Sequence, residues 1–296
     1  MPNDLRTVSD STPQPQARPG EPAWKELCAV LNGLRRVAGN WWRQMTEDDE
    51  AVPRVDESAV AVRIRGNVLA EISLCHGAPQ CRIEPEHLLL AHPGARAVLG
   101  EGETEVRAVR TLGELAGHFG QVRRRACRHT DRRQAVLDRL FLRHACVLAV
   151  DAPFGGAPVD LVAMSPQGMV VFFLLRRYAD ADLRLRGRGG VGWRMTELDR
   201  RLADTQAAAI WVHDLLERCA ALDTRHCRRY RVPRHLHIHP HARLMVVDFD
   251  HAQRQAGLDA LRADLEDGLD RSGARSDIHC LGDAGNISFG TFFSGI

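Results

Sequence analysis

The order of helix-type and strand-type segments after residue 131 constrains the fold more than any other feature of the sequence. Apolar residues at helical spacing first predict a helix that ends near His144. Three short apolar segments follow and predict strands at Cys146–Val150, Val159–Met164 and Met169–Leu175. The turn residues from Ser165 to Gly168 predict a hairpin between the second and third strands.

The segments around and after these strands complete the pattern. The sequence DAPFGGAP predicts a break between the first two strands, and RLRGRGGVG at 184–192 predicts a loop. Apolar residues on one helical face from Met195 to Leu216 predict one long helix. A fourth strand at Arg243–Phe249 and a final helix at Leu258–Leu269 follow. The order helix, three strands, helix, strand, helix predicts an α/β fold with a mixed sheet.

The region before residue 123 has a different character. Residues 1–22 are rich in Pro, Ser, Thr and Gln and predict a disordered leader. For residues 23–122 we expect a smaller α+β region. Apolar residues at helical spacing up to Met45 indicate helix, and weak alternation within 58–83 indicates short antiparallel strands. Thr111 and Glu114 form a candidate capping box that opens a helix. We therefore expect an N-terminal α+β region followed by an α/β core at 123–296.

Composition narrows the class of protein. The 296 residues are 44% hydrophobic with a net charge of +2, which suits a sizeable core. No apolar run approaches the ~20 residues that span a bilayer, and the N-terminus lacks the pattern of a secretory signal. We therefore expect a cytoplasmic protein without a membrane partner. The eight cysteines are scattered, without a CxxC pair, so we expect reduced thiols.

Arginine supplies nearly all of the positive charge, because Lys25 is the only lysine among 40 basic residues. Residues 121–201 hold 16 arginines and eight acids, whereas the whole chain is almost neutral. Such a basic segment is typical of proteins that bind DNA or RNA through phosphates, although an arginine-rich solvated surface is the simpler alternative. The candidate nucleic-acid-binding residues are Arg123, Arg124, Arg125, Arg128, Arg132, Arg176, Arg177, Arg184, Arg186 and Arg188.

The stretch from Asp160-Leu-Val through Gly168 to Leu174-Leu-Arg176-Arg177, followed by Asp182-Leu-Arg184, resembles the PD-(D/E)xK nuclease superfamily. It is most similar to uncharacterised bacterial nuclease-like proteins, over roughly residues 125–250. The resemblance implies a restriction-endonuclease-like core of a helix, three strands, a helix and a strand. In that family, an Asp on one strand and a Glu on the next hold divalent cations that activate water. A Lys two residues after the Glu lies on the same strand face.

This chain departs from the family's catalytic pattern. Asp160 matches the Asp, but Leu174 stands at the Glu position and Arg176 at the Lys position. Leucine cannot ligate Mg²⁺, which requires oxygen donors. Asp131 could provide the acid that the family often places on its first helix. Glu197 and Arg201 have the spacing of the family's Gln-x-x-x-Tyr but not its residue types, and Gln206 is a competing placement. The resemblance therefore implies a nuclease fold with a degenerate site.

Three functions follow from these residues. The first is a catalytically degenerate module that binds nucleic acid or a protein partner and needs no cofactor. The second is an active Mg²⁺- or Mn²⁺-dependent nuclease, in which Asp160 and Glu197 hold the metal and Arg176 clamps phosphate. The third is a structural or assembly protein without a ligand, which includes a homo-oligomer.

A run of alternate histidines gives one further candidate site. If the segment is extended, His235, His237 and His239 lie on one face, and histidine is a common metal ligand. Metal sites usually gather ligands from more than one element, however. The alternative is a histidine-lined approach to the strand at 243–249.

Overall fold

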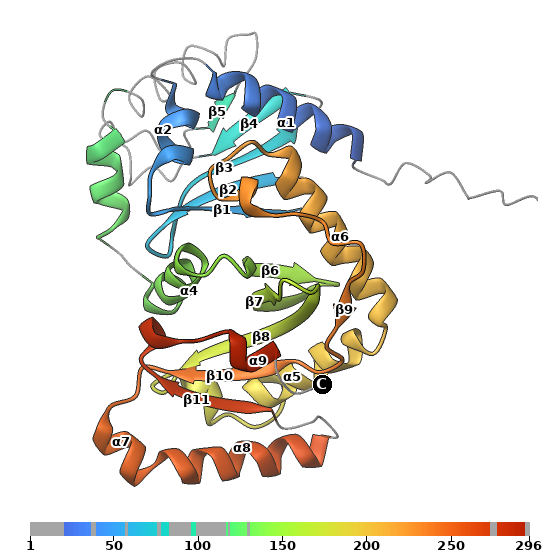
Figure 1. The fold of residues 1–296 in the computed structure, drawn as a ribbon. Coiled ribbons are helices and arrows are strands. Elements are labelled where there is room, and N and C mark those ends of the chain that lie inside the picture. Colours follow the sequence, from blue (N-terminus) through green and yellow to red (C-terminus); the bar gives the residue numbers. More distant parts are fainter. Residues whose placement is uncertain are drawn as a thin grey trace, which may run out of the picture.

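A computed structural model describes residues 21–36, 40–56, 59–75, 78–82, 96–98, 117, 119–128, 131–272 and 277–293. Two β-sheets lie one beside the other in this part of the chain, with helices packed around them (Figure 1). The predicted leader falls almost wholly outside the described residues, as does the candidate capping box. None of the described helices is both long and apolar enough to cross a bilayer.

The first sheet is antiparallel and has the order β1-β2-β3-β4-β5. The short antiparallel strands expected within 58–83 are therefore confirmed. Its strands are β1 (Ala51–Val55), β2 (Ala59–Ile64), β3 (Asn67–Cys75), β4 (Ala78–Arg82) and β5 (Arg96–Val98).

Two helices precede this sheet where the spacing up to Met45 suggested continuous helix. They are α1 (Glu21–Arg35) and α2 (Trp41–Glu47). The second helix starts separately because the side chain of Asn40 accepts a hydrogen bond from the backbone N–H of Trp42 and so caps a new N-terminus. Residues 119–126 are also helical, so the boundary expected between 122 and 123 falls inside a helix.

The second sheet has the order β11-β10-β8-β7-β6, and β9 pairs with the first residues of β8. Strands β6, β7 and β8 are antiparallel neighbours, whereas β8, β10 and β11 run parallel. The expected α/β fold with a mixed sheet is thus present. The strands are β6 (Val147–Phe154), β7 (Ala157–Met164), β8 (Met169–Arg177), β9 (His237–Ile238), β10 (Arg243–Val247) and β11 (Ile278–Gly282).

The turns of the antiparallel strands confirm one expectation and correct another. Between β7 and β8, the N–H of Gly168 donates to the carbonyl of Ser165 at 3.0 Å, as the turn chemistry predicted. The sequence DAPFGGAP is not a break, because β6 and β7 continue through it and turn only at Gly155 and Gly156. Both glycines have positive φ, at 54° and 81°, which makes this tight turn accessible.

The helices of the second region follow the expected order with one correction. The apolar face from Met195 to Leu216 belongs to two helices, because the Asp204 side chain accepts from the N–H of Ala207 and caps the second one. Short 3₁₀ turns are present at η2 (Ala181–Leu183), η3 (Gly187–Gly189), η4 (Cys227–Arg229) and η5 (Ala284–Asn286). The helices are α4 (Arg132–Arg143), α5 (Val191–Leu202), α6 (Thr205–Ala221), α7 (His251–Ala256), α8 (Leu258–Ser272) and α9 (Gly290–Phe293).

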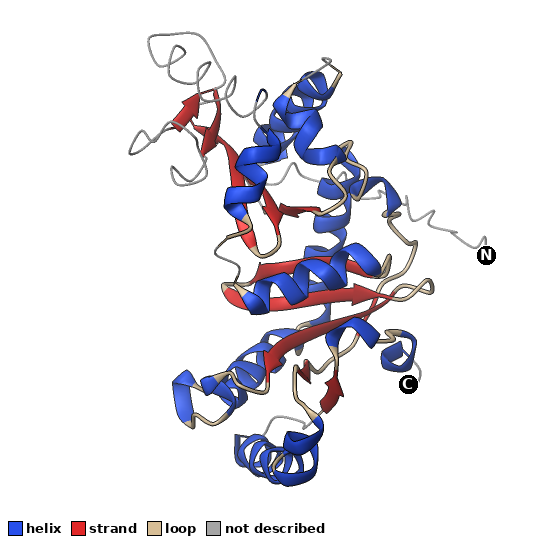
Figure 2. Ribbon diagram, turned by 90° about the vertical axis from the view of Figure 1, so that its left-hand side faces the viewer, coloured by secondary structure: helices blue, strands red, loops and turns tan. Residues whose placement is uncertain are grey.

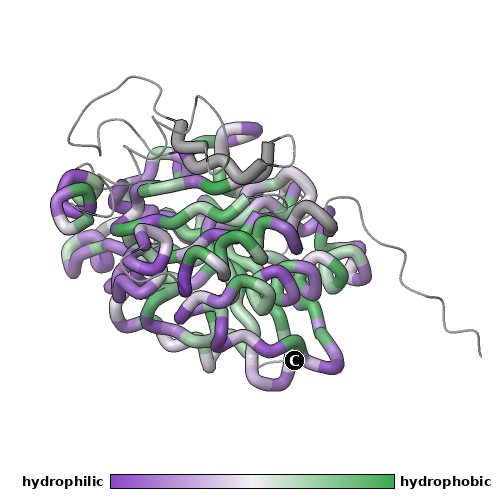
Figure 3. The backbone as a smooth tube through the Cα atoms, turned by 90° about the horizontal axis from the view of Figure 1, so that it is seen from above, coloured by the Kyte–Doolittle hydropathy of each residue, from purple (hydrophilic) through white to green (hydrophobic). Residues whose placement is uncertain are grey.

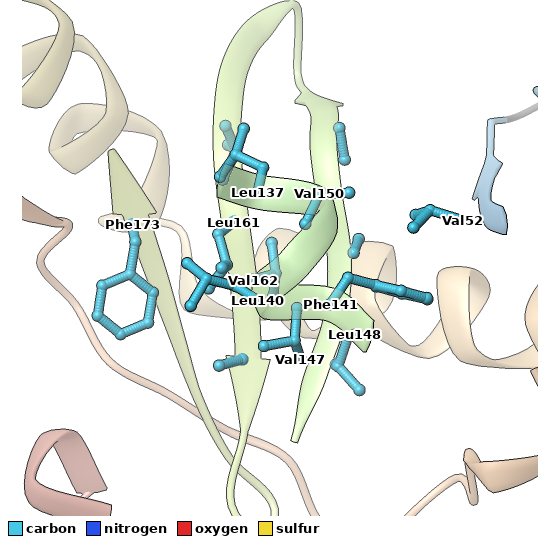
Figure 4. Close-up of a cluster of buried hydrophobic side chains, with 14 of the residues drawn as sticks. Val52, Leu137, Leu140, Phe141, Val147, Leu148, Val150, Leu161, Val162 and Phe173 are labelled. Carbon is cyan, nitrogen blue, oxygen red and sulfur yellow. The ribbon is translucent and has the colours of Figure 1, made fainter. Parts of the chain in front are cut away.

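Helix α4 lies in front of the second sheet in Figure 2, and its apolar face is buried against the strands. Leu137, Leu140 and Phe141 extend from this helix toward β6 and β7, and Val52 of β1 lies beyond them (Figure 4). The apolar segments occupy the interior, and hydrophilic segments gather at the periphery (Figure 3). The buried side chains of both sheets form one continuous core.

A buried polar cluster joins the two sheets. Arg63 of β2, which is 1% exposed, forms ion pairs with Asp138 of α4 at 3.4 Å and with Asp151 of β6 at 3.2 Å. It also donates to Gln134 at 2.6 Å, and Asp138 accepts from the N–H of Gly66 at 2.6 Å. Helix α6 runs alongside both sheets (Figure 1) and packs on both β1 and β6.

Candidate functional site

Asp160 and Arg176 meet on one face of the second sheet. Phe173 of β8 pairs with Leu161 of β7, so the same antiparallel register places Asp160 opposite Leu174. Arg176 is two residues further along β8 and therefore shares this face. Both charged side chains are buried, with Asp160 at 3% and Arg176 at 1% exposure.

The carboxylate of Asp160 is fully engaged by donors. Its Oδ2 accepts from the backbone N–H of Leu175 at 2.8 Å and forms a short ion pair with Nη1 of Arg176. Its Oδ1 lies 3.3 Å from Nη1 of Arg133, which reaches the site from the first turn of α4. Hydrogen bonds and cations of this kind compensate for burial of a carboxylate.

The guanidinium of Arg176 lies between two carboxylates. Its Nε donates to Oδ2 of Asp182 at 2.6 Å, on the side away from Asp160. Burial alone would lower the pKa of Arg176, but Asp160 and Asp182 together raise that pKa above its usual value. The side chain is therefore a permanent buried cation shared by β7, β8 and the start of η2.

These residues do not fit a divalent metal ion. The cation of Arg176 repels a second cation near Asp160, and Leu174 offers no oxygen ligand. Leu174 is 1% exposed and shares its strand face with buried Val170 and Phe172. Phe172 in turn packs on Trp211 of α6, with ring centroids 5.9 Å apart.

The other two positions implied by the resemblance have structural partners of their own. The Asp131 side chain caps α4 by accepting from the N–H groups of Arg133 and Gln134. Glu197 binds Arg201 at 2.6 Å and also pairs with Arg200, and the hydrogen bond from Arg201 lowers the pKa of Glu197. Among the described residues, no hydrogen bond or ion pair joins Glu197 to Asp160.

The structure separates the candidate nucleic-acid-binding arginines into two groups. The expectation that Arg176 contacts phosphate is wrong, because its side chain is buried and forms ion pairs with Asp160 and Asp182. Arg123 is paired with Asp48 and Glu50, and Arg177 with Asp248 at 3.0 Å. Arg125 is half-buried. The exposed members of the set are Arg124, Arg128, Arg132, Arg184, Arg186 and Arg188.

The alternate histidines do not converge on a common point. His235 and His237 are exposed, whereas Nδ1 of half-buried His239 lies 2.7 Å from the carbonyl of His241. Within the described ranges, the one group of side chains with metal-ligand spacing is His213, Asp214 and Glu217 on the surface of α6. The histidine-lined approach to β10 is therefore the better description of the run.

The sequence did not indicate two contacts of the site, which are those of Arg133 with Asp160 and of Asp182 with Arg176. Asp182 follows Arg176 by six residues, and Arg133 stands next to the candidate Arg132. The spacing shows neither contact, because they depend on where the first turn of α4 and the turn η2 lie relative to β7 and β8.

The chain matches no protein-family model, and comparisons with curated proteins and with solved structures gave no match. The functional argument therefore rests on the geometry of this site and on the surface around it.

Proposed function

We propose that this chain is a catalytically inactive, nuclease-like protein that binds nucleic acid without a metal cofactor. The observation that carries the proposal is the buried guanidinium of Arg176 between Asp160 and Asp182, at the place where the family resemblance expects metal chemistry. An arginine there keeps the charge of the family's lysine while excluding the cation that activates water.

The arrangement of elements supports the nuclease-like part of this proposal. Helix α4, the antiparallel strands β6, β7 and β8, helix α5 and the parallel strand β10 follow the order that the resemblance implies. The exposed arginines support the binding part, because exposed cations attract phosphates.

The test measures binding and cleavage on the same substrates. Labelled DNA and RNA, single-stranded and duplex, are titrated with the full chain in EDTA over a series of salt concentrations. We expect metal-independent binding that weakens steeply with salt. Incubation with Mg²⁺ or Mn²⁺ should then leave the substrates uncut.

Two results would overturn the proposal. Cleavage that is lost in both Asp160→Ala and Glu197→Ala would show an active enzyme with a rearranged site. Absence of binding to every nucleic acid at low salt would favour a structural or assembly role.

A further inference from the structure

The segment that follows the Arg176–Asp182 contact carries unpaired cations. Arg186 and Arg188 are exposed, and neither has a hydrogen-bond or ion-pair partner among the described residues. Arg184 instead donates to the carbonyl of Tyr178 at 2.8 Å, and its guanidinium lies 4.8 Å from the centre of that ring. Arg186 and Arg188 are thus available to an anionic ligand.

Exposed apolar side chains flank these cations. Leu185 is 55% exposed and Trp193, in the first turn of α5, is 43% exposed. Trp193 is the one exposed Trp, Tyr or Phe side chain within the described ranges. A solvent-exposed tryptophan in the same short segment as two exposed arginines suits a ligand that offers both flat rings and negative charge.

The backbone of this segment is already ordered. The N–H of Gly190 donates to the carbonyl of Gly187 at 2.9 Å, and η3 packs against α5. A Cβ at position 190 would lie 2.0 Å from the carbonyl oxygen of Leu185, so only glycine allows the chain to close on itself here. Asp182 fixes the start of the segment through Arg176. An ordered segment loses little conformational entropy on binding.

Helix α8 limits the surface on one side. It packs against α5, and Leu269 of α8 lies 3.8 Å from the position that a Cβ on Gly192 would take. Protein therefore covers this side of the segment.

We propose that residues 184–193 bind single-stranded nucleic acid, with Arg186 and Arg188 on phosphates and Trp193 stacked on a base. This inference rests on the proposed function and gives the buried ion pair a role, which is to hold the binding segment in place. A single strand is favoured over a duplex because stacking on an exposed ring needs an unpaired base.

The experiment uses fluorescence anisotropy with the full chain and a labelled oligothymidylate of about 15 nucleotides. Trp193→Ala should weaken binding about tenfold, with little effect on a duplex of equal length. Arg186→Gln with Arg188→Gln should weaken binding and reduce the slope of log affinity against log salt by about 1.4, or ~0.7 per lost phosphate contact.

The matched control is Arg231→Gln with Arg234→Gln. Both arginines are exposed, and they flank Pro233, which lies next to Gly168 in the turn at the other end of β8. This control should leave both affinity and slope unchanged.

The outcomes separate the two proposals. Absence of any binding by the unmodified chain would refute the proposed function itself. Binding that is unaffected by the 184–193 variants would refute only this inference, as would equal losses in the control. Equally tight capture of an acidic polypeptide, lost in the same variants, would show that the segment recognises negative charge on a protein.

Discussion

Arg176 and Asp160 form a buried ion pair between neighbouring strands β8 and β7, and Asp182 binds the opposite side of the same guanidinium. The pair connects the sheet to the segment that carries the exposed Arg186, Arg188 and Trp193. The guanidinium of Arg176 is a fixed positive charge that is 1% exposed.

Removing Asp160 should be strongly destabilising. Asp160→Ala leaves the buried guanidinium with Asp182 as its remaining acid partner, and we expect a loss of about 3–5 kcal/mol in the free energy of unfolding. Urea unfolding measures it. Asp160→Leu combined with Arg176→Met should cost less than Asp160→Ala alone, because both fully buried charges are removed together. Asp182, which is 18% exposed, keeps Arg194 at 3.8 Å. A double variant as unstable as the sum of its parts would show that the two side chains do not interact.

The strand geometry can be tested by rebuilding the family's motif. Leu174→Glu alone should destabilise the chain by several kcal/mol, because it buries a carboxylate in place of an apolar side chain. Leu174→Glu with Arg176→Lys creates beside Asp160 the Glu and Lys spacing of the PD-(D/E)xK pattern that the sequence resembles. Melting curves with and without Mn²⁺ should show metal-dependent stabilisation in this double variant and none in the unmodified chain. A double variant whose melting temperature does not change with Mn²⁺ would mean that the side chain at position 174 does not face Asp160.

Asp138, in the polar cluster between the two sheets, should make the free energy of unfolding depend on pH. Burial raises the pKa of Asp138 from 3.8 to about 6, although Arg63 acts in the opposite direction. The folded chain therefore holds a proton that the unfolded chain releases, so this contribution to stability falls as pH rises from about 4 to about 6. Its size is about 3 kcal/mol for a shift of roughly two pKa units.

A second buried group also titrates in this pH range, because burial lowers the pKa of His226 to about 4. Comparison with Asp138→Asn separates the effect of Asp138 from that of His226, since the variant keeps His226. His226 acts in the opposite direction, since its contribution is lost as pH falls below the ordinary histidine pKa. The stability of the unmodified chain minus that of the variant should therefore fall between pH about 4 and about 6. A difference that is constant with pH, measured by urea unfolding, would contradict the raised pKa of Asp138.

The buried cysteines should be unreactive in the folded protein. Burial raises the pKa of Cys28 to about 12, and both Cys219 and Cys227 are buried. Iodoacetamide must reach the sulfur and find it as thiolate. Burial should therefore protect all three thiols until the chain unfolds, including Cys227, whose pKa is lowered by its hydrogen bond with Cys219. Half-buried Cys127 should react earlier because reagent can reach it. Peptide mapping after native and denaturing labelling measures this. Native labelling of Cys28 at the rate of Cys127 would refute it.

The sequence indicated the order of elements because periodicity is a local signal. It identified the hairpin at Ser165 to Gly168 and the mixed sheet, but it missed β11, whose partner β10 lies some thirty residues earlier. It also joined α5 to α6, because the cap at Asp204 interrupts the backbone without interrupting the apolar face.

The candidate site was only partly predictable. The sequence showed that Leu174 and Arg176 depart from the family pattern, and it placed Asp160 beside them. It could not show that Arg176 points inward to Asp182, since the ion pair depends on the turn of the chain into η2. A count of arginines likewise cannot separate Arg176 and Arg177, which are paired with acids, from the free Arg186 and Arg188.

Calorimetric titration of Mn²⁺ into the unmodified chain, with Asp160→Ala as control, tests the central claim most directly. If Arg176 excludes the cation, the two proteins should give the same heats, with no saturable binding that depends on Asp160. Stoichiometric binding by the unmodified chain that disappears in Asp160→Ala would contradict the account, because it would show that a metal can bind beside the buried guanidinium.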